Sequence, residues 1–431
     1  MMRDFSIYKK IEFQAPDSIR KTQEALFREH LRYCSQNSPY YKKIFSRRGQ
    51  WWRGFTLERL PELPFTDKSR LEKYNDVFLA VPPRKIVDIV LSSGTTGQPT
   101  RIAYTESDLR RLAYNEEQSF HSCGMTAEDR VLLTCTMDRC FVAGFAYFSG
   151  VRAIGAAAIR NGLNSLESHF ETIRRLHPTA IVGVPTFLKK LGQYLRGQGV
   201  KKTGVRMLVC IGEPLRGADM DFLPLGRELE RLWGAKVYST YSSSEIISSF
   251  CECTSQKGGH LHPELAVVEI IDESGKPREA GFTGELVVTP LMIEGMPLIR
   301  FKTGDISFLI PERCRCGRKS VRLGPILGRK QQMMKIRGTT VYPQAIFSVL
   351  EETGRVAEYC ISVRQESILS DAVTVHAAVT DKDCSAAYIQ EQLQARLRVR
   401  PDVIVEEEEM LRSRVYPQKS RKPVRFFDYR R

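Results

Sequence analysis

The sequence predicts an α/β protein with two domains: a large N-terminal domain with mainly parallel sheets and a β-rich subdomain, and a small α+β C-terminal domain. Two observations predict this class. At 431 residues, the chain is longer than one compact core usually allows. Short β-rich runs also alternate with helical patterns through its first half, and such alternation is typical of a mostly parallel sheet.

The large domain is expected to begin with a helix and to continue with alternating strands and helices. Apolar residues recur among charges at helical spacing over residues 18–33. The β-rich runs that follow cover residues 86–91, 130–134, 180–184, 207–211 and 236–238, and helical patterns cover 166–176 and 187–195. Three later runs, 266–272, 284–289 and 298–301, follow one another with turns between them and predict the β-rich subdomain.

The small domain is predicted to begin after a strongly polar stretch. The sequence GRKQQMMKIRG starts at Gly328, and a new pattern follows it. Helical spacing covers 345–352 and 385–397, and β-rich runs cover 359–364 and 372–379. We therefore expect the domains to comprise residues 1–328 and 329–431.

The composition is that of an ordinary globular protein. Hydrophobic residues make up 42% and charged residues 27% of the chain, which argues against a disordered, fibrous or disulfide-scaffold protein. The first residues lack the apolar core of a secretory signal, and the longest apolar stretch, 142–159, is interrupted by Arg152. Eleven scattered cysteines are typical of reduced intracellular thiols. We therefore expect a cytoplasmic protein without a membrane span.

A Ser/Gly/Thr-rich loop directly follows the first β-rich run. It reads LSSGTTGQPT from Leu91 to Thr100. Glycines allow close backbone approach, and the hydroxyl and N–H groups can bind phosphate oxygens. The loop lacks the Gly-Lys-Ser/Thr ending of a Walker loop, so it does not predict a P-loop NTPase. Taken alone, it fits a phosphate cradle or a flexible turn.

Further segments follow in an order that resembles one known family. They are NSPYY near the N-terminus, SSGTTGQPT, GVPT at 183–186, IGEP at 211–214, YSSSE at 241–245, IRFKTGD at 299–305, ILGR at 326–329, GTTVYP at 338–343 and the tail PQKSRKPVRFFD. Together they resemble the adenylate-forming (AMP-binding) superfamily, most closely its phenylacetate-CoA ligase-like branch. The ordered set spans nearly the whole chain and is far more specific than any one member.

The resemblance implies that the protein activates a carboxylic acid. A carboxylate is a poor acyl donor because its leaving group would be oxide. Family members therefore convert it into an acyl-AMP, with release of pyrophosphate, and then pass the acyl group to a thiol. The protein is accordingly expected to be an acid:thiol ligase that uses ATP, Mg²⁺ and coenzyme A. We expect no nucleic-acid partner, and a monomer or homodimer.

The resemblance also implies roles for individual residues. Glu245 would hold Mg²⁺, Ser244 would contact the phosphate or carboxylate, and Lys422 would be the catalytic lysine that bridges the acid and the α-phosphate. Tyr241 would stack on adenine, and Asp305 would accept hydrogen bonds from the ribose hydroxyls. The full set expected to bind ATP is Ser92, Ser93, Gly94, Thr95, Thr96, Gly97, Gly212, Glu213, Pro214, Tyr241, Asp305 and Arg329.

The small domain of this family is mobile. It rotates after adenylation, which withdraws the lysine and opens a thiol channel that Gly338 is expected to face. Lys422, rather than Lys419, aligns with the catalytic position, although a basic tail by itself is equally typical of a solvated or polyanion-binding segment. Two residues depart from the family's pattern. Gln98 stands where the phosphate loop usually has lysine, and Gln331 stands where Asp or Lys is common. The missing lysine removes one cation from the pyrophosphate side, so ATP affinity or rate is expected to be modest.

The acid is expected to bind among apolar side chains between the parallel-sheet elements. The expected lining residues are Phe141, Phe145, Tyr147, Phe148, Val184 and Ile211. Because ligand pockets are mostly hydrophobic with few polar groups, an aromatic acid is the better match. The same residue types are equally typical of an ordinary core.

Two Cys/His segments suggest a structural zinc site. Zinc favours four tetrahedral thiolate or imidazole ligands, and a C-x₆-H pair joined to a distant C-x-C pair supplies Cys₃His. By resemblance to some phenylacetate-CoA ligase-like proteins, the ligands are Cys253, His260, Cys314 and Cys316, whereas Cys251 and His262 are bystanders. The alternative is a set of reduced cysteines in β-turns.

Two other functions remain open at this stage. The enzyme could load a carrier-protein phosphopantetheine or an amine acceptor, and the net charge of +15 suits an acidic carrier as well as coenzyme A. A zinc-ribbon nucleic-acid-binding protein would explain Cys314, Cys316 and the basic tail, but not the phosphate loop, YSSSE or TGD. Acid-dependent pyrophosphate exchange separates this last class from the others, and thiol competition separates the acceptors.

Overall fold

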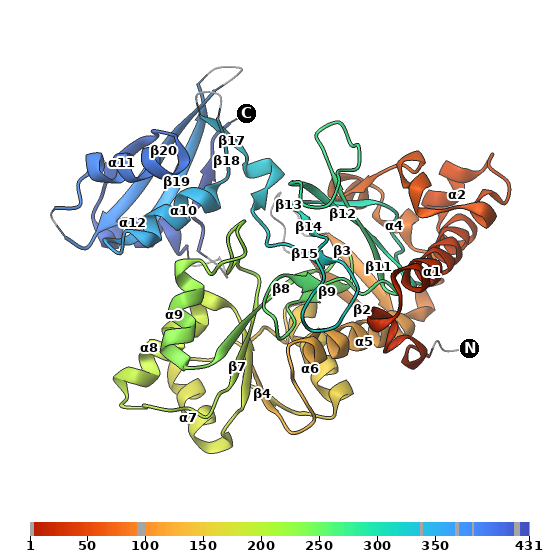
Figure 1. Ribbon diagram of the computed structural model, residues 1–431, viewed down its shortest axis with the longest axis horizontal. Coiled ribbons are helices and arrows are strands. Elements are labelled where there is room, and N and C mark those ends of the chain that lie inside the picture. Colours follow the sequence, from red (N-terminus) through yellow and green to blue (C-terminus); the bar gives the residue numbers. More distant parts are fainter. Residues whose placement is uncertain are drawn as a thin grey trace. The chain divides into compact units, whose positions relative to one another are not determined.

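The computed structural model describes residues 4–92, 100–336, 339–366, 370–381, 383–417 and 423–430, which form two compact units (Figure 1). The first unit comprises residues 1–303 and 307–325, and the second comprises 304–306 and 326–431. The chain thus enters the second unit at residues 325–326, close to the expected boundary at 328–329. Residues 304–306 join the second unit although their neighbours belong to the first.

A six-stranded sheet forms the centre of the first unit. Its order is β5-β4-β6-β7-β8-β9, in which neighbours from β5 to β8 are parallel and β9 is antiparallel. The strands are β4 (Arg130–Leu133), β5 (Ala157–Arg160), β6 (Ala180–Gly183), β7 (Met207–Ile211), β8 (Lys236–Ser243) and β9 (Ser248–Cys251). The predicted mostly parallel sheet is confirmed, and four of its strands begin at the expected residues.

Helices cover both faces of this sheet, because alternate strand residues point to opposite sides. Val131 and Leu133 of β4 face a cluster shared with α5 and α6, whereas Leu132 faces one shared with α7, α8 and α9. Figure 1 shows the two helical layers on either side of β4 and β7. The helices are α5 (Glu106–Ser122), α6 (Val142–Ile154), α7 (Leu166–Leu176), α8 (Pro185–Gly197) and α9 (Pro224–Trp233).

A β-rich part accompanies this three-layer core, as predicted. One sheet has the order β1-β13-β12-β11, and its strands are β1 (Thr66–Asp67), β11 (Ala266–Ile271), β12 (Gly284–Pro290) and β13 (Phe301–Ser307). The expected strand at 298–301 was placed too early. Arg300 has φ +45°, a left-handed conformation outside the β region, and the strand begins at the next residue, Phe301.

Smaller elements complete the first unit. The N-terminal helix is α1 (Pro16–Asn37), which begins with a proline whose fixed φ suits a first helical turn. It contains the expected helix at 18–33. The other elements are α2 (Pro39–Phe45), α3 (Lys68–Lys73), α4 (Asn75–Phe78), the hairpin of β2 (Ile86–Leu91) and β3 (Arg101–Thr105), and a small sheet of β10 (Gly259–His260), β14 (Leu309–Ile310) and β15 (Arg322–Leu323).

The second unit is an α+β domain, as predicted. Its main sheet has the order β21-β20-β19-β22. Helices α10 and α11 pack on one face with Val363 and Val375, and α12 packs on the other with Cys360 and Ala378. The elements are β16 (Gly328–Arg329), β17 (Met334–Ile336), β18 (Thr339–Val341), α10 (Pro343–Glu352), β19 (Val356–Gln365), β20 (Asp371–Val379), α11 (Ala386–Leu397), β21 (Asp402–Val405), α12 (Glu408–Val415) and β22 (Phe426–Asp428).

No helix in the described part of the chain is both long enough and apolar enough to cross a membrane. The longest apolar stretch of the sequence forms α6 and β5, with Gly155 ending the helix between them.

A buried ion pair stabilises the start of β13. Arg300 is 1% exposed and donates two hydrogen bonds to Glu269 of β11, at 3.0 and 2.9 Å, and a third to the Leu63 carbonyl at 2.9 Å. Its guanidinium also lies 4.0 Å from the centre of the Phe65 ring. Within the IRFKTGD segment, Arg300 therefore acts as a structural anchor.

Replacing Arg300 with methionine should destabilise the first unit by about 3–5 kcal/mol, because Glu269 would be left buried without a partner. Urea denaturation followed by tryptophan fluorescence measures this unit alone, since Trp51, Trp52 and Trp233 all lie in it. Arg59→Met is the matched control, because Arg59 makes a similar two-bond pair with Glu62 on the surface. An equal loss of stability in both variants would contradict the anchoring role.

Candidate active site

Three of the family-like segments meet at one edge of the central sheet. GVPT follows β6, IGEP ends β7, and YSSSE ends β8. These strands are adjacent and parallel, so their carboxyl ends lie side by side, where ligands bind in open α/β sheets. Segments that are separated in the sequence therefore lie together at one edge of the sheet.

The predicted phosphate loop connects the antiparallel strands β2 and β3. The Ser92 N–H donates to the Thr100 carbonyl at 2.9 Å, and the Thr100 N–H donates to the Ser92 hydroxyl at 3.3 Å. Both residues are buried, so the two ends of the loop are fixed next to each other. The remaining loop residues, Ser93, Gly94, Thr95, Thr96, Gly97 and Gln98, lie outside the described part of the chain.

The turn that contains Ser244 and Glu245 is tied to this hairpin. It links β8 to β9, and its Ser244 carbonyl accepts a hydrogen bond from the Tyr104 hydroxyl of β3 at 3.1 Å. Burial and the nearby Glu245 carboxylate raise the pKa of Tyr104 well above its usual value, so the hydroxyl stays protonated and can donate. Glu245 is half-buried and accepts a hydrogen bond from Ser243. Sequence reasoning missed Tyr104, which belongs to none of the quoted segments.

Glu213 links two family-like segments. Its carboxylate accepts hydrogen bonds from the Thr186 N–H at 3.0 Å and from the Thr186 hydroxyl at 2.9 Å. Thr186 lies in the first turn of α8, where a negative charge is favoured by the helix dipole. The preceding Gly212 has φ +75°, a conformation that favours glycine. The Glu213 side chain therefore fixes the turn after β7, a role that the sequence did not reveal.

The other expected adenine and ribose residues occupy both units. Tyr241 lies on β8, half-buried, and its ring stacks at 6.4 Å on Phe250. In the second unit, Asp305 and Arg329 are opposite each other in the pairing of β13 with β16, and their side chains form an ion pair at 3.2 Å. Lys422 and Gly338 lie outside the described residues.

The expected acid-binding residues are divided between interior and surface. Tyr147, Val184 and Ile211 pack in or against the interior cluster under α6, and Tyr147 is 1% exposed. Phe141 and Phe145 are half-buried. A separate cavity of about 380 Å³ is lined by residues that include Arg139, in the loop between β4 and α6, and Arg160 and Asn161 at the end of β5.

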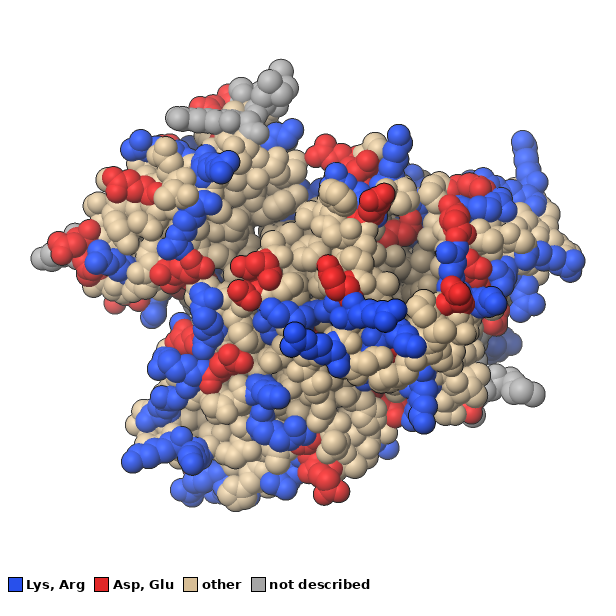
Figure 2. Space-filling model, viewed as in Figure 1, with Lys and Arg blue, Asp and Glu red and all other residues tan. Residues whose placement is uncertain are grey.

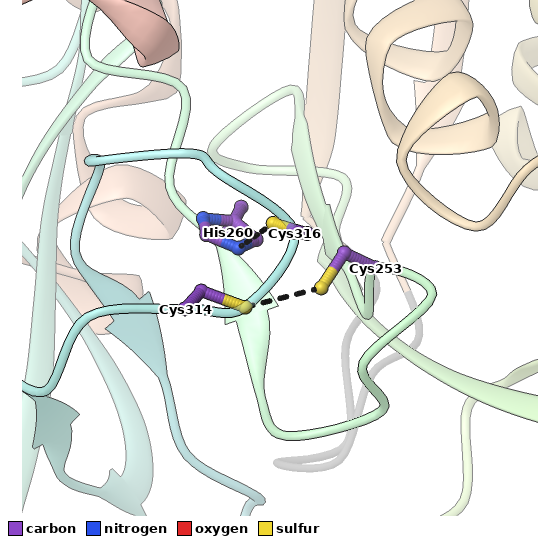
Figure 3. A group of neighbouring side chains, drawn as sticks. All are labelled: Cys253, His260, Cys314 and Cys316. Atoms are coloured by element: carbon purple, nitrogen blue, oxygen red, sulfur yellow. Dashed lines mark hydrogen bonds between the residues drawn. The ribbon is translucent and has the colours of Figure 1, made fainter.

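Four potential metal ligands converge beside the small three-stranded sheet (Figure 3): His260 lies on β10, and three cysteines lie in the loops after β9 and between β14 and β15. The ligand atoms of Cys253, His260, Cys314 and Cys316 all lie within 4.8 Å of one another. The Sγ atoms of Cys253 and Cys314 are 3.5 Å apart, and Cys316 Sγ is 3.3 Å from His260 Nε2. A tetrahedral zinc ion with Zn–S bonds of about 2.3 Å places neighbouring sulfurs about 3.8 Å apart. The set therefore fits one zinc ion.

The protonation states of two of these groups suit metal binding. Burial lowers the pKa of His260 to about 4, so its imidazole is neutral. Burial opposes ionisation of Cys314, but hydrogen bonds, led by the Cys316 backbone N–H, lower its pKa overall. The two expected bystanders lie elsewhere, because Cys251 packs in the interior cluster and His262 contacts Glu12 at 3.3 Å.

Comparisons with known proteins identify the family to which the sequence is similar. The family model for the AMP-binding enzyme matches residues 50–293. A phenylacetate-coenzyme A ligase of Thermus thermophilus is 32% identical over 372 residues, which cover 84% of this chain and 82% of the relative. Another from Pseudomonas putida is 30% identical over 384 residues, which cover 86% and 84%.

A solved structure extends the likeness to the whole fold. The 2-hydroxyisobutyryl-CoA ligase in its postadenylation state, in complex with 2-HIB-AMP, has a TM-score of 0.83 at 20% identity and covers 99% of this chain and 94% of its own. Together with a family match over more than half of the sequence, these relatives show that the chain belongs to the AMP-binding (adenylate-forming) enzyme family, in its phenylacetate-coenzyme A ligase-like branch.

Proposed function

We propose that this protein is an AMP-forming acid:coenzyme A ligase. The observation that carries the proposal is the hydrogen bond between Tyr104 and Ser244, which holds the Glu245 turn against the hairpin of the phosphate loop. A carboxylate at that place suits the Mg²⁺ that accompanies ATP. Two relatives that are named phenylacetate-coenzyme A ligases further support coenzyme A as the acceptor and an aromatic acid as the substrate.

The reaction joins two anions, so charge is its main obstacle. A carboxylate oxygen forms a bond to the α-phosphorus of ATP while the bond to pyrophosphate breaks. The thiol of coenzyme A, on losing its proton, then attacks the acyl carbon, and AMP leaves. Bound Mg²⁺ would neutralise phosphate charge. Glu245 would hold the Mg²⁺ ion, and the Lys422 ammonium would stabilise the transition state in which the acid attacks the α-phosphate.

The basic surface favours anionic substrates, but it does not distinguish coenzyme A from a carrier protein as the acceptor. On the face shown in Figure 2, lysines and arginines gather over the region of α7, α8 and α9. Such a surface raises the local concentration of ATP and coenzyme A, and it would equally attract an acidic carrier protein. A carrier-bound phosphopantetheine therefore stays the second candidate acceptor. A mobile second unit, a cytoplasmic location and a monomeric or dimeric state stay predictions.

Replacing Glu245 with glutamine should lower the kcat of acid-dependent pyrophosphate exchange by about 10²–10³-fold, because a preorganised charge near the phosphates is lost. The melting temperature should stay close to that of the unmodified protein, since the glutamine can still accept the Ser243 hydrogen bond. Glu171→Gln, on the exposed side of α7, is the matched control. Unchanged exchange in Glu245→Gln would refute its role.

Replacing Lys422 with alanine should abolish pyrophosphate exchange but largely spare thioester formation from supplied acyl-AMP, because the ammonium acts in the first half-reaction only. Lys419→Ala, three residues earlier in the same basic segment, should retain both activities. Equal loss of both half-reactions in Lys422→Ala would contradict this division, and loss in Lys419→Ala instead would reassign the catalytic lysine.

We also propose that Cys253, His260, Cys314 and Cys316 bind a structural zinc ion, because a closed set of four ligands leaves no open position for a reactant. Elemental analysis of the purified protein should find one zinc per chain. Cys316→Ser should lose the zinc and lower the melting temperature by several degrees, whereas Cys140→Ser, an exposed thiol, should change neither. Protein purified without chelators that contains no zinc would dispose of the site.

A further inference from the structure

A buried carboxylate lies behind the four-ligand cluster. Glu12 belongs to the short 3₁₀ turn Ile11–Phe13 near the N-terminus and is only 5% exposed. Its Oε1 accepts a hydrogen bond from the Ser320 hydroxyl at 3.1 Å, and its Oε2 accepts one from Arg318 Nε at 2.9 Å. Ser320 in turn lies 3.0 Å from Nδ1 of His260. Glu12 is thus connected to a predicted zinc ligand through one hydroxyl.

The direction of these hydrogen bonds follows from the number of available protons. Burial opposes ionisation of Glu12, but His262 and Arg318 outweigh it and lower its pKa to about 2. An ionised carboxylate only accepts hydrogen bonds, so Ser320 must donate its single proton to Glu12. The Ser320 oxygen is then an acceptor for His260, and Nδ1 must carry the imidazole proton.

With Nδ1 directed at Ser320, the other ring nitrogen of His260 is the one directed at the cluster. Nε2 faces Cys316 Sγ at 3.3 Å and lies among the three sulfurs (Figure 3). A neutral imidazole with a free electron pair at that atom is the form that zinc binds. In metal sites, such an outer hydrogen bond fixes the ring orientation and the tautomer of the ligand histidine.

We infer that Glu12 and Ser320 are positioning residues for the metal site, and that they fasten the N-terminal turn to the metal-binding loop. The inference rests on the proposed zinc ion. Two further contacts join the N-terminal turn to the metal-binding loop. The Lys319 N–H donates to the Glu12 carbonyl at 2.6 Å, and the Arg318 guanidinium lies 5.0 Å from the centre of the Phe13 ring.

The metal affinity and the visible spectrum of the cobalt-loaded protein test whether Glu12 and Ser320 position His260. Ser320→Ala and Glu12→Ala should each weaken zinc binding by about 10–100-fold, the usual cost of losing an outer-shell partner. The affinity is measured by competition with a chromophoric chelator. The visible absorption of the Co²⁺-substituted protein should also shift, because the imidazole can rotate. Ser320→Thr retains the hydroxyl and should restore both properties.

Lys9→Met is the matched control. Lys9 forms a 2.7 Å ion pair with Glu117, which is a second tie between the same N-terminal segment and the rest of the unit but does not reach the cluster. This variant should leave the zinc affinity and the cobalt spectrum unchanged. If it weakens zinc binding as much as Glu12→Ala does, the effect comes from fastening alone and the positioning role is overturned.

The remaining outcomes separate this inference from the zinc proposal. One outcome is that the unmodified protein binds zinc while Ser320→Ala and Glu12→Ala bind it with the same affinity as the unmodified protein and give the same cobalt spectrum. In that case Glu12 and Ser320 do not position His260, and the zinc site stands. If the unmodified protein binds no zinc at all, both fall together.

Discussion

The parallel order of β4, β6, β7 and β8 is the constraint on which the candidate site depends. Parallel strands need crossover connections, and each connection here carries a helix that covers a face of the sheet. As a result, all the parallel strands of this sheet end at the same edge. The GVPT, IGEP and YSSSE segments lie far apart in sequence, yet each follows a strand that neighbours the next. An antiparallel partner in place of β7 would carry Gly212 and Glu213 to the opposite edge.

One buried arginine and one buried tyrosine fix the turn that contains Glu245 at this edge. Arg111 of α5 is fully buried and donates to the carbonyls of Leu291, Leu265 and Ile247. Ile247 ends the turn that contains Glu245, and Tyr104 binds the start of the same turn. The turn is thus held from both sides by side chains that cannot move without leaving polar groups unsatisfied. Such preorganisation is what a site for charged reactants requires.

The sequence predicted the regular parts of the fold and the segments that form the site. Strand starts at Arg130, Ala180, Met207 and Lys236 were predicted because apolar runs with turn signals give a local pattern. The start of β13 was missed because no local pattern in the sequence marks the left-handed conformation of Arg300. A strand produces a repeating pattern of residue types in the sequence, whereas a contact between distant segments produces none.

The residues that were predicted to bind the acid show the same limit of sequence-based prediction. Tyr147, Val184 and Ile211 have the composition of a pocket, and also that of a core, and here they pack in or against the core. Apolar character alone does not separate the two, because both require burial. Similarly, nothing in the sequence around Glu12 indicates that its carboxylate lies beside Arg318 and Ser320, more than 300 residues later.

That separation bears on how the protein reaches its native state. Contacts between residues so distant along the chain close a very long loop, and the entropy of closure delays their formation relative to local helices. Glu12 is translated long before the loop at residues 314–320 exists. Until that loop is synthesised, Glu12 lacks its native partners Arg318 and Ser320, and the turn that contains Glu12 and the buried Ile11 stays available to chaperones.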